Sequence, residues 1–392
     1  MGRLGKESDF SGIVSSRFSI QFGLLIRRGA RFGAMKVEQM GIAAKCIYPG
    51  PHSSLSDEHY LPAALGSFQG CELLKDRVCS TCNRIIGERV ETQFLRGGPI
   101  AFFRWLLGIE GRDGLPPSPF YRGAAGAPPL IMHGRAPGFA YDLLWEVEPG
   151  TRDVFPLRQV LFEHPLVGIH SIPIFDRMRD HPELLSACLR ERGLQSAKPV
   201  LVYATPEEVP WVESLLRALN VEPPREWVTT GFPSGQITLK VDVGVTEAHF
   251  RAVAKIVFHY ALKMFPDLSG LEREFEPVRR YIWAGDGNHK FVRQRPDQFV
   301  AQFNRGQRPT HWMHILDVAR SRSGVVGHAQ FFVGPRHMPL PYQVWIGPDP
   351  SMLIRPLERF AHQFVILSVA PEGGIVGKME DFMPARYIIP PT

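Results

Sequence analysis

Apolar residues recur at steps of three and four along several stretches of the chain, a spacing that predicts amphipathic helices. One such stretch begins at Cys82 and runs to Leu95, and Gly97-Gly98-Pro99 ends it. A second apolar helix is expected to follow as far as about Leu107. The same spacing predicts two further helices, over 210–219 and 247–265.

Short apolar runs bounded by Pro and Gly predict strands. The first is Ile42–Tyr48, which leads into the turn Pro49-Gly50-Pro51, and a second short element spans Leu55–Leu61. Later runs of the same character predict strands at 130–154, 199–203, 314–316, 329–333, 342–346 and 364–369. Helices and strands are therefore mixed along the chain, and the predicted fold class is α+β.

Proline and glycine are concentrated in residues 111–138, a composition typical of a linker or surface loop. We therefore divide the chain into a compact domain over 41–114, a linker over 115–138 and a larger mixed α/β region over 139–392. Residues 1–40 are basic and lack a sustained apolar core. They predict either a disordered arm or an over-extended start, with Met35 or Met40 as the true initiator.

The charge balance and the cysteines restrict the partners and the compartment. A formal net charge of +6 and a pI near 9.1 favour anionic partners, nucleic acid first. No apolar run approaches the roughly 18 residues of a membrane span. The cysteine count is odd, with four of the five between Cys46 and Cys82. This grouping favours metal binding in a reducing compartment such as the cytoplasm over a disulfide framework, and the sequence leaves the oligomeric state open.

The pair Glu58-His59 has the chemistry needed for phosphodiester hydrolysis. A neutral imidazole can accept a proton from an attacking water, and a carboxylate can hold a hard cation such as Mg²⁺ or Mn²⁺. Adjacent residues on a strand point to opposite faces, so the base and the metal ligand need a bend between them to act together. The competing interpretation is a solvated acid beside a surface histidine.

The motif Cys79-Ser80-Thr81-Cys82 presents two thiolates on one side of a turn, which is half of a tetrahedral zinc site. Cys46 stands where an upstream pair would begin, but Pro49 occupies the place of its second cysteine and cannot ligate. Either His52 or Cys71 can replace it. Without a fourth ligand, these cysteines would be small core residues.

Asn83 follows the second cysteine at the predicted helix start. It can present a side-chain oxygen to a cation held by Glu58, or it can cap the helix. Gly87 and Glu91 follow at four-residue steps and share a helix face with it. For Glu91 a solvated charge is the favoured interpretation.

Three segments taken together resemble the HNH endonuclease superfamily, in the branch with a Glu-His pair and a zinc knuckle. They are Cys46-Ile47-Tyr48, the run from Ser56 to Gly66, and Cys79 to Gly87 with Glu91. The resemblance covers about seventy residues, 41–110, and implies a ββα-metal fold.

It also implies a DNA endonuclease with His59 as general base and Glu58 and Asn83 as ligands of a divalent cation. Cys46, Cys79 and Cys82 would bind a structural zinc. Two departures, Pro49 and the missing asparagine before the second cysteine pair, motivate an alternative: a non-catalytic zinc-knuckle module that binds nucleic acid through a degenerate HNH site.

Overall fold

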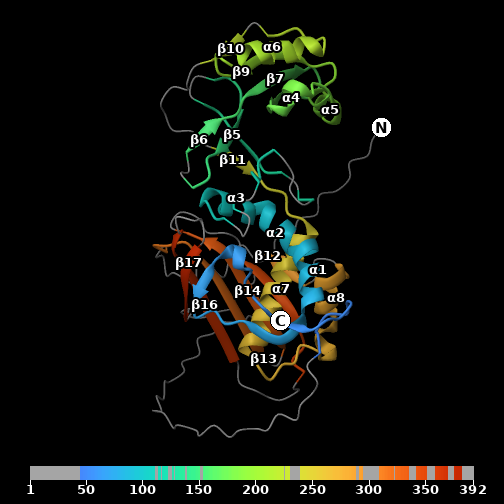
Figure 1. Ribbon diagram of the computed structural model, residues 1–392, viewed down its shortest axis with the longest axis vertical. Helices are drawn as coiled ribbons and strands as arrows, with labels where there is room; N and C mark the ends of the chain where they lie inside the picture. The colour runs from blue at the N-terminus through green and yellow to red at the C-terminus, as the bar shows by residue number, and fades with distance from the viewer. Residues whose placement is uncertain are drawn as a thin grey trace, which may run out of the picture. The chain divides into compact units, whose positions relative to one another are not determined.

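The computed structural model describes a mixed α and β protein (Figure 1). The described residues are 45–110, 114–115, 117–121, 126–127, 129–136, 139–150, 153–224, 226–229, 239–287, 291–294, 309–321, 323–334, 341–350, 358–369 and 375–381. The start predicted over 1–40 lies outside them. Within the described residues, no helix is both long and apolar enough to cross a membrane.

The largest sheet has seven strands in the order β12-β15-β14-β13-β16-β17-β2. Neighbours pair antiparallel, except that β2 lies parallel to β17. The strands are β2 (Ser67–Gln69), β12 (Val292–Gln294), β13 (Met313–Ser321), β14 (Gly324–Val333), β15 (Tyr342–Gly347), β16 (Glu358–Val369) and β17 (Ile375–Asp381). Because β2 comes from the N-terminal part, this sheet joins segments about three hundred positions apart in sequence.

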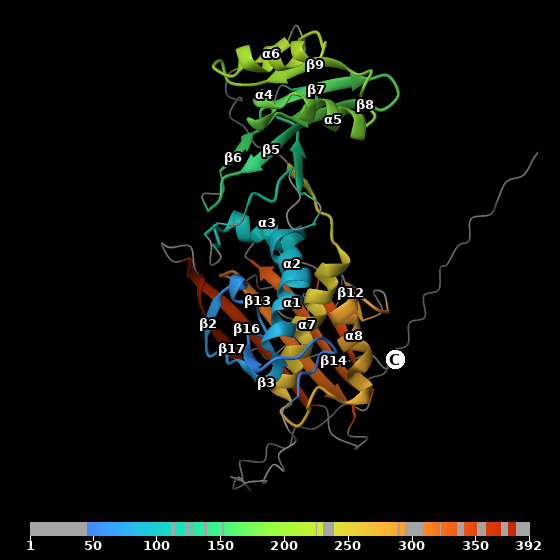
Figure 2. The same ribbon diagram turned by 45° about the vertical axis from the view of Figure 1, so that its right-hand side comes forward.

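The helix α7 (Glu247–Met264) packs against the middle of this sheet, as Figure 2 shows. Every residue from Ala252 to Leu262 is buried, so apolar side chains cover nearly its whole circumference. A helix that is apolar on all sides belongs in the interior. One hydrophobic cluster contains α7, the sheet and residues 46–109 together, so the N-terminal segment shares a core with the C-terminal part.

The N-terminal segment contains a two-stranded antiparallel sheet, β1 (Leu55–Glu58) with β3 (Leu74–Cys79), followed directly by helix. The helical stretch is α1 (Ser80–Ile86), a π-helical turn (Gly87–Glu91) and α2 (Thr92–Arg96). Gly97 is extended and ends it, and α3 (Gly98–Leu106) follows. A 3-10 turn, Ala63–Leu65, lies between β1 and β2.

The remaining strands form two smaller sheets. One sheet has the order β10-β9-β7-β8, with β10 parallel to β9, and the other has the order β11-β4-β5-β6. The strands are β4 (Ile131–Gly134), β5 (Leu143–Val147), β6 (Val154–Pro156), β7 (Gln159–His164), β8 (Gly168–Pro173), β9 (Lys198–Tyr203), β10 (Glu226–Val228) and β11 (Leu239–Asp242). The helices are α4 (Arg177–Asp180), α5 (Glu183–Glu191), α6 (Val209–Ala218), the 3-10 turn Arg273–Phe275 and α8 (Glu276–Ala284). These helices lie partly beside the two sheets and, for α8 and the 3-10 turn before it, beside α7 and β15.

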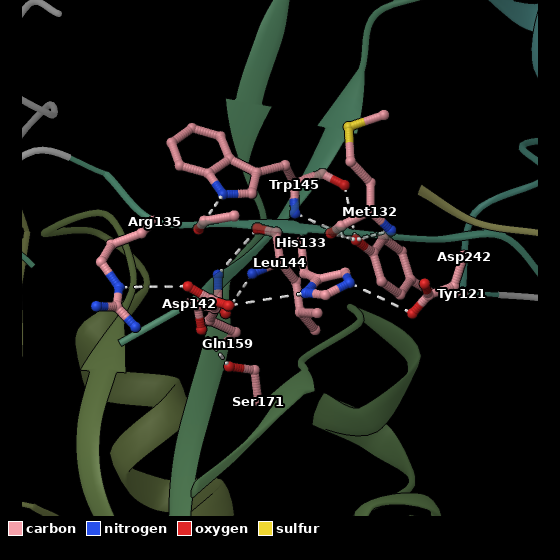
Figure 3. A network of polar contacts seen from close by, with 11 residues as sticks. Tyr121, Met132, His133, Arg135, Asp142, Leu144, Trp145, Gln159, Ser171 and Asp242 are labelled. Carbon is pink, nitrogen blue, oxygen red and sulfur yellow. Dashed lines mark hydrogen bonds and ion pairs between the residues drawn. The ribbon is translucent and has the colours of Figure 1, made fainter. Parts of the chain in front are cut away.

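A polar network holds the strands around β5 together (Figure 3). The hydroxyl oxygen of Tyr121 lies 2.5 and 2.7 Å from the carbonyl oxygens of Met132 and Trp145, to either of which its one proton can be donated, and it accepts from the amides of the same two residues. The buried amide of Gln159 bonds to both main-chain groups of Leu144. These contacts satisfy main-chain groups where the strand ladder is short, as buried polar groups require.

Most of the predicted elements are confirmed, and one is wrong. The helices predicted from Cys82, to about Leu107, over 210–219 and over 247–265 all form, as do strands at the later apolar runs. The strand predicted at Ile42–Tyr48 does not form over its described part. Residues 47–50 bend instead, and the amide of Ile47 bonds to the carbonyl of Arg77, because the chain turns here to bring Cys46 to the end of β3.

The shared core predicts that a leucine in α7 contributes far more to stability than a leucine on the surface. Leu262 is 2 % exposed, whereas Leu166 is 89 % exposed. We expect Leu262→Ala to lower the free energy of unfolding by about 2–5 kcal/mol and Leu166→Ala to change it by less than about 0.5 kcal/mol. Urea denaturation of both variants measures this, and equal losses would contradict the core assignment.

Candidate functional site

Four metal-ligating side chains converge at the end of β3. The sulfurs of Cys46, Cys79 and Cys82 and a ring nitrogen of His52 all lie within 4.8 Å of one another. In a tetrahedral site with bonds of 2.3 Å, sulfur atoms stand roughly 3.8 Å apart, so a small contraction around an ion completes the geometry. The cluster can hold a metal, and its ligands are compatible with zinc.

Local structure places these four ligands. Cys79 ends β3 and is the N-cap of α1, where its sulfur accepts a hydrogen bond from the amide of Cys82 at 3.4 Å. The amide of Cys79 donates to the sulfur of Cys46, also at 3.4 Å. Such N–H···S contacts orient ligand sulfurs and offset their charge. His52 comes from the loop before β1, with its Nδ1 4.0 Å from the sulfur of Cys79.

The three thiols differ in acidity. Burial disfavours the thiolate of Cys79, but the amides of Cys82 and Ser53 and the ring of His52 outweigh it and lower the pKa of this thiol to about 6. Burial raises the pKa of the Cys46 and Cys82 thiols. One sulfur of the cluster is therefore ready to bind a cation near neutral pH, since the thiolate is the ligating form.

Of the two alternatives for the fourth ligand, the structure brings His52 to the cluster and leaves Cys71 elsewhere. Cys71 is half-buried beside Tyr60 and Lys263, and burial raises the pKa of its thiol. The loop Pro49-Gly50-Pro51 explains why His52 and not Cys71 reaches the cluster, because this loop passes close to the cysteines directly before His52. The sulfur of Cys82 lies 3.5 Å from the carbonyl oxygen of Pro51, directly before His52.

Glu58 and His59 point to opposite sides at the end of β1. Glu58 is 5 % exposed, whereas His59 is exposed. The register of β1 against β3 shifts between Ser56 and Glu58, but this irregularity does not turn the two side chains to one side. The carboxylate is therefore buried and the imidazole is exposed, although the two residues are adjacent in sequence.

The ammonium of Lys255 forms an ion pair with the carboxylate of Glu58. Lys255 lies on α7 with a side chain that is 0 % exposed, and its Nζ donates to Glu58 Oε1 and, at 2.6 Å, to Glu91 Oε1. Glu91, interpreted from the sequence as a solvated charge, is therefore bound in an ion pair. The sequence offered one signal for Lys255: a charge within a long apolar helical run, which requires a buried partner.

Burial and charge act in opposite directions on this triad. Burial raises the pKa of Glu58, and the ammonium of Lys255 only partly offsets it. Burial lowers the pKa of Lys255, but the carboxylates of Glu91 and Glu58 outweigh it, so its pKa lies above the ordinary value. Lys255 therefore stays protonated inside the core, because two acids face it.

Asn83 is half-buried on α1 and makes no side-chain hydrogen bond with any described residue. It is the fourth residue of α1, whose N-cap is Cys79. Gly87 begins the π-helical turn and Glu91 ends it. An added Cβ on Gly87 would lie 3.9 Å from Glu91 Oε2, so this oxygen faces the side of the helix where Gly87 has no side chain.

No protein-family model matches the chain, and comparisons with curated proteins and with solved structures also give no match.

The cluster predicts which substitutions remove a bound metal. We expect His52→Ala and Cys82→Ser to lose most of the metal that the wild-type protein carries, because each removes a ligand atom from the set of four. Cys71→Ser is the matched control and should retain it. Elemental analysis of the purified variants measures this, and metal loss in Cys71→Ser alone would contradict the ligand set.

Proposed function

We propose that the N-terminal segment is an HNH-type endonuclease unit that hydrolyses phosphodiester bonds in DNA, with His59 as general base. The observation that carries the proposal is the antiparallel pair of β1 and β3 with α1 directly after β3, and with the Cys/His cluster where β3 meets α1. The exposed His59 follows β1 directly. A neutral imidazole open to solvent can take a proton from a water that attacks phosphorus.

We further propose that the metal of the cluster is zinc. Three sulfurs and one imidazole nitrogen are a common ligand set of structural zinc, and the ion would tie residues 46–52 to the start of α1. Its part would be structural, because four protein ligands leave no open position for a water. Elemental analysis should find about one zinc per chain, and a well-folded protein without zinc would contradict this assignment.

The predicted hydrolytic cation, Mg²⁺ or Mn²⁺ at Glu58 and Asn83, does not fit the arrangement described here. The Oε1 of Glu58 is bound by the ammonium of Lys255, and no described polar contact links Asn83 to Glu58. In this arrangement, a cation held by Glu58 and Asn83 therefore has no part in the proposed hydrolysis. The chain itself supplies the exposed imidazole of His59, which directly follows β1.

The contact between Lys255 and Glu58 favours a second candidate: a non-catalytic module that binds nucleic acid through a degenerate HNH site. In such a module, the former cation ligand would serve only as a partner for the buried ammonium. The net charge of +6 supports binding to nucleic acid in either case.

Cleavage of plasmid DNA separates the two candidates. We expect the wild-type protein to cut the plasmid and His59→Ala to cut about 10²–10⁴-fold more slowly under the same conditions, the usual contribution of a general base. His181→Ala removes another exposed histidine, on the loop before α5, and should cut normally. Equal rates for wild type and His59→Ala would reject the base, and binding without cleavage by the wild type would support the module.

A further inference from the structure

We propose that a cleft between residues 45–52 and α8 binds one unpaired nucleotide of a DNA strand, with its base on Trp283 and its phosphate on Lys45. His59 lies outside this cleft. Binding of the strand stands on the cleft alone, whereas its meaning for cleavage rests on the proposed nuclease function.

The cleft is formed by two walls from distant parts of the sequence. One wall is the loop before β1, and the other consists of residues 271–286, which include α8. The volume of the cleft is about 480 Å³, within the range of about 300–1,000 Å³ that is usual for small-molecule sites. Cys46 and His52, two ligands of the Cys/His cluster, lie on the loop wall. The cleft is therefore large enough for a nucleotide, and the cluster helps to hold one of its walls.

Trp283 gives the cleft an aromatic surface. Its side chain is half-buried, and its ring stacks on that of Tyr48, with centroids 6.3 Å apart and an interplanar angle of 28°. Gly50 lets the loop approach this ring closely, because an added Cβ there would lie 2.3 Å from Cη2 of Trp283. The indole N–H makes no hydrogen bond with any described residue. An aromatic ring held in this way can stack on a nucleobase.

Two arginines line the cleft, but other groups already bind them. The guanidinium of Arg279 donates to the carbonyl of Ile47 at 3.1 Å and to the carbonyls of residues 271 and 272, so it ties the two walls together. Arg280 forms an ion pair with Asp286 at 3.0 Å, with side chains that are 59 % and 51 % exposed. Such an exposed pair contributes little to stability, so Arg280 can exchange this partner for a phosphate.

Lys45 is the cation of the cleft that remains available. Its side chain is exposed and makes no hydrogen bond or ion pair with any described residue. The next residue, Cys46, is held by the contact of its sulfur with the amide of Cys79, so the main chain at Lys45 is fixed beside the cleft. A lysine ammonium binds phosphate as a point charge.

Two carboxylates in the cleft, those of Glu276 and Asp286, restrict the class of ligand. They repel a bare phosphate, although the cations beside them attract it. A nucleotide suits this mixture of charges, because its phosphate is anionic while a base such as adenine carries an amino donor that a carboxylate can accept. The ligand expected from the lining is therefore a base together with its phosphate.

The strand β1 lies between the cleft and His59. Leu55, its first residue, pairs with Cys79 of the cluster, whereas Glu58 ends it directly before His59. Four residues of strand extend about 13 Å, which equals about four nucleotides of a stacked strand. A base inside a duplex is stacked and paired, so it reaches a cleft only when it is unpaired. The substrate expected from this arrangement has unpaired nucleotides near the cut.

The salt dependence of DNA binding tests the role of Lys45. Fluorescence anisotropy measures binding of a labelled deoxyadenosine strand of about twelve nucleotides to the full-length protein, with His59→Ala in every sample so that the strand stays uncut. We expect Lys45→Ala to bind more weakly and to lower the slope of log affinity against log salt by about 0.7, the loss of one phosphate contact on a single strand. Lys198→Ala, an exposed lysine at the start of β9, is the matched control and should keep both values.

Substitution of Trp283 tests the stacking. Trp283→Leu should lower the affinity for the strand about tenfold, the usual loss for one stacked base, and leave the salt slope unchanged. Trp283→Phe keeps an aromatic face and should retain most of the affinity. Neither variant should change the affinity for a duplex of the same length. Circular dichroism identifies the folded variants, and Lys45→Ala, at an exposed side chain, keeps the test decisive if Trp283→Leu does not fold.

Three results would overturn the inference: a wild-type salt slope in folded Lys45→Ala, an equal loss of duplex affinity in Trp283→Leu, or displacement of the strand by equimolar dAMP, which would indicate a site for free nucleotides. Plasmid cleavage by the protein with His59 intact is measured in parallel. Effects of Lys45→Ala and Trp283→Leu on binding without any cleavage would reject the nuclease and keep the nucleotide site. Cleavage with wild-type strand binding in both variants would do the reverse.

Discussion

The ion pairs of the Lys255 ammonium with Glu58 and Glu91 are the interaction on which the rest of the structure depends. The ammonium lies on a fully buried stretch of α7 and binds carboxylates from β1 and from the end of the π-helical turn. Burial of this ammonium carries a large desolvation cost, and the two carboxylates that bind it offset that cost. Consequently, β1, the π-helical turn and α7 must stand in one fixed relation. The apolar core that surrounds them makes that relation stable, but the ion triad decides which register is allowed.

The Cys/His cluster is a second constraint, and it acts on the loop before β1, part of which is buried in the same core. Residues 45–54 contain no helix or strand, so few main-chain ladder bonds hold them. Side chains hold them instead: the sulfur of Cys46 and the ring of His52 lie at the start of α1, and the hydroxyl of Tyr48 bonds to the ring of His259. The cluster and the triad thus fix opposite ends of the same short sheet: the cluster lies at the end of β3, and Glu58 ends β1. His59 stands directly beyond that second end, on the exposed side.

The thiols and the acids of this segment suit different kinds of cation. The thiols and the imidazole suit a soft or borderline ion, whereas Glu58 and Glu91 suit a hard one. The ammonium of Lys255 supplies a positive charge, which explains how Glu58 can be buried at the end of β1 with Glu91 of the π-helical turn close to the same point.

Much of the fold and part of the candidate site could be predicted from local pattern. The helices near Cys82 and over 247–265, the later strands and the cysteine pair all depend on residues within a few positions of one another, where periodicity and turn residues are informative. The predicted strand at Ile42–Tyr48 was wrong over its described part because an apolar run also suits a bend that buries a ligand.

The sequence by itself determined which residue types are present for metal and acid–base chemistry, and it left His52 and Cys71 as equal alternatives. Only the tertiary structure selected His52 and paired Glu58 with Lys255, which is 197 positions away. Periodicity shows that α7 is buried but not which of its side chains faces a distant strand. The physical reason is that a buried charge takes its partner from packing in three dimensions, and that packing depends on the whole core.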